Sequence, residues 1–327
     1  MSSNFSFQKC EISEWDQILE NLDQSTFFCK SYFLKSLGSK FHLWKILQGK
    51  EIKAGVCLNV DDTEKKSIEN EFVIHNGIFF KLDQNRVITK KREDEFQITS
   101  FIIENLVKQY DTIFLSLDPS IVDIRPFQWF NYKKNAPKFK IEIKYTSILD
   151  LSNLRKNESV ENSTIFENLE PVRRYSVRQA IKEEAKVKFV KDKEKFLDLY
   201  KNLLIKIDPK NYENKINIVS KIIESVLKKN KGIIVNTEDK DKNLLYSVFC
   251  GWDNNKAYYI FGVGSEENKK SWQGTIGQWS LFRYIVENTE IDKFDFEGVN
   301  SPQRGWFKLG FGGKLVPYYQ LNYEKFK

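Results

Sequence analysis

The chain reads FDFEGVNSPQRGWFKLGFGG from Phe294 to Gly313, and this segment says most about how the protein folds. Successive side chains of a strand point to opposite faces. We therefore predict a short strand with Phe294 and Phe296 on one face and Asp295 and Glu297 on the other. The segment begins with a strand that has one aromatic and one acidic face.

A turn and a short helix follow this strand. Gly298 releases the strand, and Ser301-Pro302 is typical of a helix start. Arg304 and Lys308 are four residues apart, so both cations project from one helix face, next to a turn that contains Gly310, Gly312 and Gly313. Two cations beside exposed backbone amides suit a phosphate or a developing oxyanion. The alternative is a surface turn with solvated basic side chains.

The rest of the chain suits a two-domain protein without disulfides. It has 327 residues, 41% hydrophobic, which is enough for two domains of about 150 residues. The net charge of +7 is too small for a protein that coats nucleic acid, and it suits an anionic small molecule or an acidic membrane surface. The four cysteines have no paired spacing, which predicts buried free thiols in a reducing compartment: Cys10, Cys29, Cys57 and Cys250.

Hydrophobic periodicity predicts the same order of elements twice. The first half is predicted as strand 5–9, helices 11–22 and 30–37, strands 41–47, 52–60 and 72–80, helix 93–110, and strands 112–117 and 141–151. The second half is predicted as strand 187–190, helices 193–205 and 214–229, strands 232–237, 244–252 and 257–263, helix 273–288, strand 294–297, a short helix 303–309 and strand 314–323. We predict a structural duplication with domains at residues 1–151 and 152–327, with the alternative that the last strand returns to the first domain.

This order is similar to that of the GNAT acyltransferase fold, which predicts an α/β protein with two tandem GNAT-like domains and mixed sheets. In that fold two central strands splay apart, and their opened backbone groups can receive the amide-bearing arm of a donor. A fold-level likeness supports a transferase without proving one.

A basic helix is predicted between the halves, from about Ser163 to Glu184, after a polar linker that starts at Ser152. The part from Pro171 to Lys186, read as helix, carries Arg174, Arg178, Lys182 and Lys186 at four-residue spacing, and these side chains form one basic stripe. The stripe could bind a pyrophosphate, a lipid-linked phosphate or an RNA backbone. The alternative is a solvated helix face.

Several motifs, in order along nearly the whole chain, resemble the FemABX peptidyltransferases, tandem-GNAT enzymes that add amino acids to peptidoglycan precursors. Besides the segment at 294–313, the resemblance rests on Ser25-Thr-Phe-Phe28 with Tyr32, Leu115-Ser-Leu-Asp-Pro119, Tyr145-Thr-Ser-Ile-Leu-Asp-Leu-Ser152 and Tyr258-Tyr-Ile-Phe-Gly-Val-Gly-Ser265.

The resemblance implies roles for particular residues. Phe307 and Lys308 match the family's Phe-Lys pair that contacts the acceptor, and Lys308 would steady negative charge. Asp118 matches an Asp placed near the reacting amine, where it would accept a proton, and Tyr259 matches a tyrosine that faces the acceptor. The alternatives are an Asp-Pro turn opener and a core tyrosine.

Two departures from the family pattern concern the second domain. The family's Arg-Asp after the first long helix is replaced by Lys206-Ile-Asp208-Pro209, so Lys206 only approximates that contact. The pyrophosphate loop of simple GNAT enzymes is present only in part, at Gln273–Gln278. Coenzyme A binding at that loop is therefore in doubt.

Other chemistries have little support. The only histidines are His42 and His75, so a catalytic Ser-His or Cys-His pair is not expected. No spacing of His, Cys or carboxylate residues predicts a metal site. The first residues lack the basic segment and the following apolar segment of a signal peptide, so none is predicted. No apolar run has the length of a membrane span. A cytoplasmic protein with peripheral contact with the inner membrane is expected.

The predicted function is transfer of an acyl or aminoacyl group to an amine of a peptidoglycan or surface-glycan precursor, linked to a nucleotide or a lipid. No tightly bound cofactor is expected. The donor implied by the resemblance is aminoacyl-tRNA, and the alternative is acyl-CoA used on an amino sugar. A different class of function, a non-catalytic binding module on the duplicated fold, also stays open. The sequence indicates no oligomeric state.

Overall fold

The computed structural model describes residues 4–20, 22–24, 27–81, 83, 85–156 and 163–326. Ser25 and Thr26, which belong to one of the family motifs, lie outside the described residues. The chain divides into two compact units. Unit 1 consists of Met1–Lys144 and Pro317–Lys327, and unit 2 of Tyr145–Val316. The domain boundary predicted after Leu151 stays a prediction.

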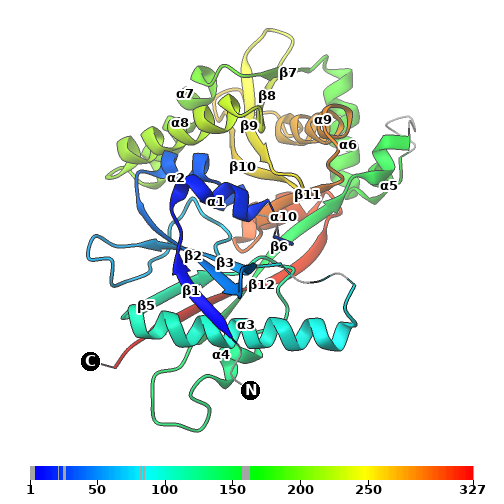
Figure 1. The fold of residues 1–327 in the computed structure, drawn as a ribbon. Helices are drawn as coiled ribbons and strands as arrows, with labels where there is room; N and C mark the ends of the chain where they lie inside the picture. Colours follow the sequence, from blue (N-terminus) through cyan, green and yellow to red (C-terminus); the bar gives the residue numbers. More distant parts are fainter. Residues whose placement is uncertain are drawn as a thin grey trace. The chain divides into compact units, whose positions relative to one another are not determined.

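Unit 1 holds an antiparallel sheet in the order β1-β2-β3-β4 and a second pair of strands, β5 with the end of β12 (Figure 1). Its elements are β1 (Phe5–Lys9), α1 (Ile12–Leu19), η1 (Phe27–Cys29), α2 (Ser31–Leu37), β2 (Lys40–Gln48), β3 (Glu51–Val60), β4 (Gly77–Phe80), α3 (Ile88–Gln109), β5 (Thr112–Ser116), α4 (Arg125–Trp129) and the start of β6 (Lys140–Asp150).

The core of unit 1 forms between α3 and the strands. Ile98, Ile102 and Leu106 recur every four residues on α3, so they share one face and are all buried. They pack with residues of β3 and β5, and with Leu321 and Tyr323 from β12 (Lys314–Glu324). The last strand of the chain therefore contributes to the core of unit 1.

Unit 2 contains strands in the order β6-β11-β10-β9-β8-β7, in which only β10 and β11 are parallel neighbours. Its elements after β6 are η2 (Ser152–Lys156), α5 (Thr164–Asn168), α6 (Pro171–Lys182), β7 (Lys186–Val190), α7 (Glu194–Ile207), α8 (Tyr212–Lys228), β8 (Gly232–Glu238), β9 (Leu244–Trp252), β10 (Ala257–Gly264), α9 (Gln273–Asn288), β11 (Lys293–Gly298), α10 (Pro302–Leu309) and the start of β12.

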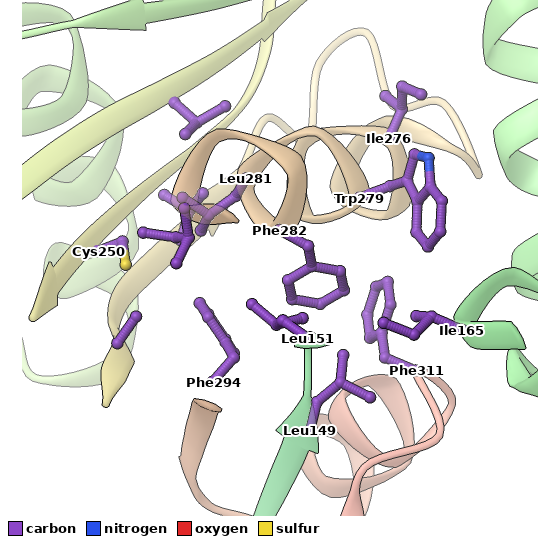
Figure 2. Packing of buried hydrophobic residues seen from close by; sticks show 14 of the residues in the cluster. Leu149, Leu151, Ile165, Cys250, Ile276, Trp279, Leu281, Phe282, Phe294 and Phe311 are labelled. Carbon is purple, nitrogen blue, oxygen red and sulfur yellow. The ribbon is translucent and has the colours of Figure 1, made fainter. Parts of the chain in front are cut away.

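The core of unit 2 is centred on Phe282 of α9. Its ring lies 5.0 Å from that of Phe294, 5.8 Å from Phe296 and 5.6 Å from Phe311, all between centroids and edge to face. Figure 2 shows Phe282 pointing from α9 towards Phe311, with Leu149 and Leu151 of the β6 end nearby. Edge-to-face packing is favoured because the positive edge of one ring meets the negative face of another.

The predicted duplication is confirmed in element order. From β1 to β6 and again from β7 to β12, the chain runs strand, helix, helix, three strands, helix, strand, helix, strand. The helix missing from the first-half prediction is α4, which has only five residues. The four cysteines are buried and free, as predicted.

Three element predictions were wrong. The helix expected at 163–184 is two helices, because Pro171 starts α6 and disfavours a helical Glu170 before it. The strand expected at 72–80 pairs only over Gly77–Phe80, and α3 starts five residues earlier than predicted.

In the described part of the chain, no helix has the length and apolar character that a membrane span requires.

Replacing Phe282 with alanine removes the ring on which the unit 2 core converges. We expect Phe282→Ala to lower the free energy of unfolding by about 3–5 kcal/mol, because the ring is lost and a cavity remains. The measurement is chemical denaturation followed by circular dichroism. Tyr175→Ala, at a side chain that is 63% exposed, is the control and should change the value by less than about 0.5 kcal/mol.

Glu95 on α3 should make the stability of the protein fall as the pH rises. Burial, and secondarily Asp123, raises the pKa of the Glu95 carboxyl from 4.5 to about 7. Between pH 4.5 and about pH 7 the folded state keeps the Glu95 proton, whereas the unfolded state releases it. The free energy of unfolding therefore falls as the pH rises through this range. Glu95→Gln should therefore raise the melting temperature near pH 8 and leave it little changed near pH 4. Glu104→Gln, on an exposed position of α3, should show no such pH-dependent gain.

Candidate functional site

The two parallel strands of unit 2 pair briefly and then part. β10 and β11 pair only at Ala257–Phe294 and Tyr258–Asp295, although β10 continues to Gly264. Each strand also shifts register against its other neighbour, β10 between Tyr259 and Phe261 and β11 between Asp295 and Gly298. The splayed central strands expected from the GNAT-like order are thus present in unit 2.

Asp295 lies fully buried where the strands part. Its Oδ1 accepts a hydrogen bond of 2.5 Å from the Thr146 hydroxyl and one of 2.8 Å from the backbone N–H of Glu297. Its Oδ2 is 3.8 Å from the Lys256 ammonium. The two bonds to Oδ1 compensate part of the burial cost and hold β11 against β6, while the buried Oδ2 has no hydrogen-bond partner among the described residues.

Glu297 is buried with less compensation. Its side chain is 6% exposed, and its Oε1 has no hydrogen-bond partner in the described structure. Its backbone φ is +58°, a left-handed conformation that costs energy for a residue other than glycine. Burial raises the pKa of the Glu297 carboxyl well above its usual range, with Asp295 acting in the same direction and Lys308 opposing. Glu297 therefore combines a strained backbone with a buried carboxyl oxygen that lacks a hydrogen-bond partner within the described part of the chain.

Lys308 extends from α10 into the same place. It is 8% exposed, its Nζ donates a 3.2 Å hydrogen bond to the Gly298 carbonyl, and the nitrogen lies 4.8 Å from the ring centroid of Tyr259. Burial, and to a lesser degree Arg304, lowers the pKa of Lys308, whereas Glu297 and Asp295 oppose the shift. The solvated basic turn considered from the sequence describes Arg304, which is exposed, but not Lys308.

Tyr259 of β10 contacts both Lys308 and a residue of the neighbouring strand β9. Its hydroxyl is 3.2 Å from that of Tyr246 on β9, and burial raises the pKa of Tyr259. The ring packs partly against the hydrophobic core, so the core alternative is right in part. Its other contact is the Lys308 ammonium, which binds the ring face by a cation–π interaction.

Phe307 covers the amino end of α9. A Cβ built on Gly274 would lie 3.2 Å from the Phe307 ring, and the Arg173 guanidinium carbon is 4.7 Å from that ring's centroid. Arg173 also donates a 3.3 Å hydrogen bond to the Thr275 hydroxyl. Residues 273–279 of this helix are all buried. The partial pyrophosphate loop is therefore covered by side chains of its own unit.

Asp118 lies in unit 1, just after β5, and is buried. Its Oδ1 accepts a 2.9 Å hydrogen bond from the Ser120 N–H and a 2.6 Å bond from the Ser120 hydroxyl. These bonds fit the turn-opening role considered from the sequence. Four predicted site residues therefore come together in unit 2, namely Lys308, Arg304, Tyr259 and Phe307, while Asp118 belongs to the other unit.

The remaining predicted residues make local contacts in unit 2. Lys206 at the end of α7 pairs with Glu266 and is exposed. Arg174 donates a 3.0 Å hydrogen bond to the Leu169 carbonyl and another to that of Glu167, which caps the end of α5. The Arg178 guanidinium carbon lies 5.4 Å from the Phe166 ring centroid. The predicted stripe through Lys186 is wrong because α6 ends at Lys182 and Lys186 begins β7.

Glu297 was not among the residues predicted for the site. Strand alternation places it on one face with Asp295, but alternation alone does not show that this face is buried. In the part of the chain that the structure describes, no group of three His, Cys, Asp or Glu side chains could hold a metal ion.

The Thr146 hydroxyl should be important for the stability of this site. Thr146→Val keeps the shape of the side chain and removes a donor to the buried Asp295, so we expect a loss of about 1–3 kcal/mol in the free energy of unfolding. Thr164→Val, at an exposed position, is the matched control and should lie within about 0.5 kcal/mol of the wild type. Equal stabilities of the two variants would contradict the assignment.

The comparisons with known proteins agree on the fold. No family model matches the chain, and no curated protein matches it in sequence. Among solved structures it is similar to FemX, with a TM-score of 0.64 and 11% identity over 96% of both chains. It is also similar to a tandem GNAT protein from the clavulanic acid biosynthesis pathway, with a TM-score of 0.56 and 10% identity over 98% of both chains.

A third similar structure is L-PGS from Bacillus licheniformis, with a TM-score of 0.54 and 10% identity over 98% of this chain and 94% of that one. At such identities the likeness concerns the fold. The chain therefore has the tandem GNAT fold that FemX also has, and the resemblance seen in the sequence motifs is confirmed at that level.

Proposed function

We propose that the protein is a transferase that moves an activated acyl or aminoacyl group to an amine of a cell-envelope precursor. The observation that carries the proposal is the buried ammonium of Lys308, held beside Glu297 and Tyr259 where β10 and β11 part. A buried cation at an opened strand edge is suited to a reaction that develops negative charge on a carbonyl oxygen.

The proposed mechanism is direct attack of the amine on the activated carbonyl, without a covalent enzyme intermediate. Holding the two reactants in line supplies several kcal/mol of the barrier, on the order of 7–11 kcal/mol in the best intramolecular cases. The Lys308 ammonium stabilises the oxygen that becomes negative. Arg304, which is exposed next to it on α10, binds phosphate of the acceptor, and Phe307 lies against the acceptor's apolar part. The family resemblance implies Asp118 of unit 1 as the acceptor of the amine's proton.

We favour aminoacyl-tRNA over acyl-CoA as the donor. In simple GNAT enzymes the donor's pyrophosphate binds at a glycine-rich helix start, a location that suits anions because backbone N–H groups are free there. In this chain the corresponding start of α9 is buried under Phe307 and Arg173. The same covering disfavours the N-acyltransferase alternative that would use acyl-CoA on an amino sugar.

The acceptor is proposed to be linked to a nucleotide or a lipid and to be part of peptidoglycan or a surface glycan. This proposal rests on the resemblance to FemX, together with the exposed cations near the site. It places the protein in the cytoplasm, with peripheral contact with the inner membrane when the acceptor is lipid-linked, and it needs no tightly bound cofactor.

The test is transfer by the purified protein from radiolabelled alanyl-tRNA or acetyl-CoA to a UDP-linked peptide or amino-sugar precursor, with donor binding measured by calorimetry. Labelled precursor formed from alanyl-tRNA supports the proposal. Product formed only from acetyl-CoA favours the N-acyltransferase alternative. Acceptor binding without product from either donor favours the binding module and contradicts the proposal.

Removing the charge of Lys308 should abolish most of the transfer. We expect Lys308→Met to lower kcat by about 10²–10³-fold, the usual effect of deleting one group that stabilises an oxyanion. Lys314→Met, at an exposed lysine that follows the glycine turn, is the matched control and should keep the wild-type rate. Unchanged transfer by Lys308→Met would remove this residue from the mechanism.

A further inference from the structure

We propose that Glu297 is the proton carrier of the reaction: it takes a proton from the attacking amine and returns it to the leaving group. The inference rests on the proposed transferase function and assigns to unit 2 a catalytic residue that neither the sequence motifs nor the comparisons point to. Its basis is the placement of the Glu297 carboxyl.

Three structural features single out this carboxyl. It lies on the part of β11 that no longer pairs with β10, two residues beyond Asp295, where that pairing ends. A left-handed backbone and a register shift against β6 set its direction. Its Oε1 is buried without a hydrogen-bond partner in the described structure, as is the Oδ2 of Asp295, but the other oxygen of Asp295 accepts bonds from Thr146 and from the backbone. Strained backbone and unsatisfied buried groups concentrate at functional sites because nothing in the fold alone rewards them.

The titratable groups around Glu297 come from several elements. Asp295 precedes it on β11, Lys308 projects from α10, Tyr259 comes from β10 and Cys250 from β9, and Arg304 of α10 lies by Lys308 and Tyr259. Burial raises the pKa of Glu297 and Lys308 opposes the shift. A carboxyl with a raised pKa is a stronger base than an ordinary glutamate and is therefore better suited to take a proton from an amine.

The reaction then balances without any further reagent. The lone pair of the neutral amine attacks the carbonyl carbon and forms the C–N bond, while the carbonyl oxygen becomes negative near Lys308. The Glu297 carboxylate takes one N–H proton. When the C–O bond to the donor breaks and the carbonyl re-forms, Glu297 gives this proton to the departing oxygen and is again a carboxylate.

Asp118 is the competing proton acceptor, from the family resemblance. Its Oδ1 already accepts two hydrogen bonds from Ser120, so this oxygen is engaged in the turn that follows β5. If Asp118 accepts the proton, Asp118→Asn should lose the rise of the rate with pH. If Glu297 accepts it, Glu297→Gln should lose that rise instead.

The experiment measures single-turnover transfer from alanyl-tRNA to the UDP-linked peptide precursor as a function of pH. We expect Glu297→Gln to lower the rate by about 10²–10⁴-fold with little change in KM, and to remove the rise of the rate with pH. Glu297→Asp should keep that rise at a lower rate. Glu290→Gln, at an exposed position of unit 2, is the control and should behave as the wild type.

Failure of the inference differs from failure of the proposed function. If the wild type transfers no group from alanyl-tRNA or from acetyl-CoA, the proposed function fails, and this inference fails with it. If the wild type and Glu297→Gln transfer at the same rate with the same pH profile, only the inference is overturned. Loss of the pH dependence in Asp118→Asn but not in Glu297→Gln also overturns it. Infrared difference spectra of the wild type, against Glu297→Gln, show independently of turnover whether the pKa of Glu297 is raised. Titration at an ordinary glutamate pKa contradicts the inference.

Discussion

Two residue pairs hold β10 to β11, and the arrangement of unit 2 depends on how early that pairing ends. Each strand is bound on its other side, β10 by β9 and β11 by β6, so neither can bend to follow the other. Backbone groups beyond Asp295 then need partners from elsewhere, because a buried C=O without a hydrogen bond is costly. The Lys308 ammonium supplies one of them at Gly298. The same opening that creates this need places a cation and a carboxyl together.

The fold could be predicted well from the sequence because it follows from hydrophobic periodicity. Strands such as Leu244–Trp252 and helices such as Gln273–Asn288 are long and apolar enough to be identified in isolation. Their order identified the duplicated architecture. The short helix α4 was missed because five residues carry too little periodic signal. Pro171 marks the start of α6, but the helical pattern on both sides of it also predicts one continuous helix at 163–184, so the break was not predicted.

The candidate site was only partly predictable because burial of a charged residue is a tertiary property. The spacing of Arg304 and Lys308 placed both on one helix face, yet one is exposed and the other almost fully buried. Nothing in that spacing separates them. Arg174 and Arg178 show the same limit: their spacing predicts a basic stripe, and it carries no sign that they contact the α5 carbonyls and Phe166. Arginine forms such contacts readily because its planar fork both donates hydrogen bonds and stacks on rings.

The assignment of the final strand to unit 1 also has a consequence for biosynthesis. Unit 2 is continuous in sequence, from Tyr145 to Val316, whereas unit 1 needs Pro317–Lys327 to complete it. Leu321 and Tyr323 belong to its core, and β12 covers the edge of β5. A ribosome therefore makes most of unit 1 before unit 2 and its closing strand only after unit 2. Until then the nascent chain presents an uncovered β5 edge, the kind of unpaired edge that templates aggregation.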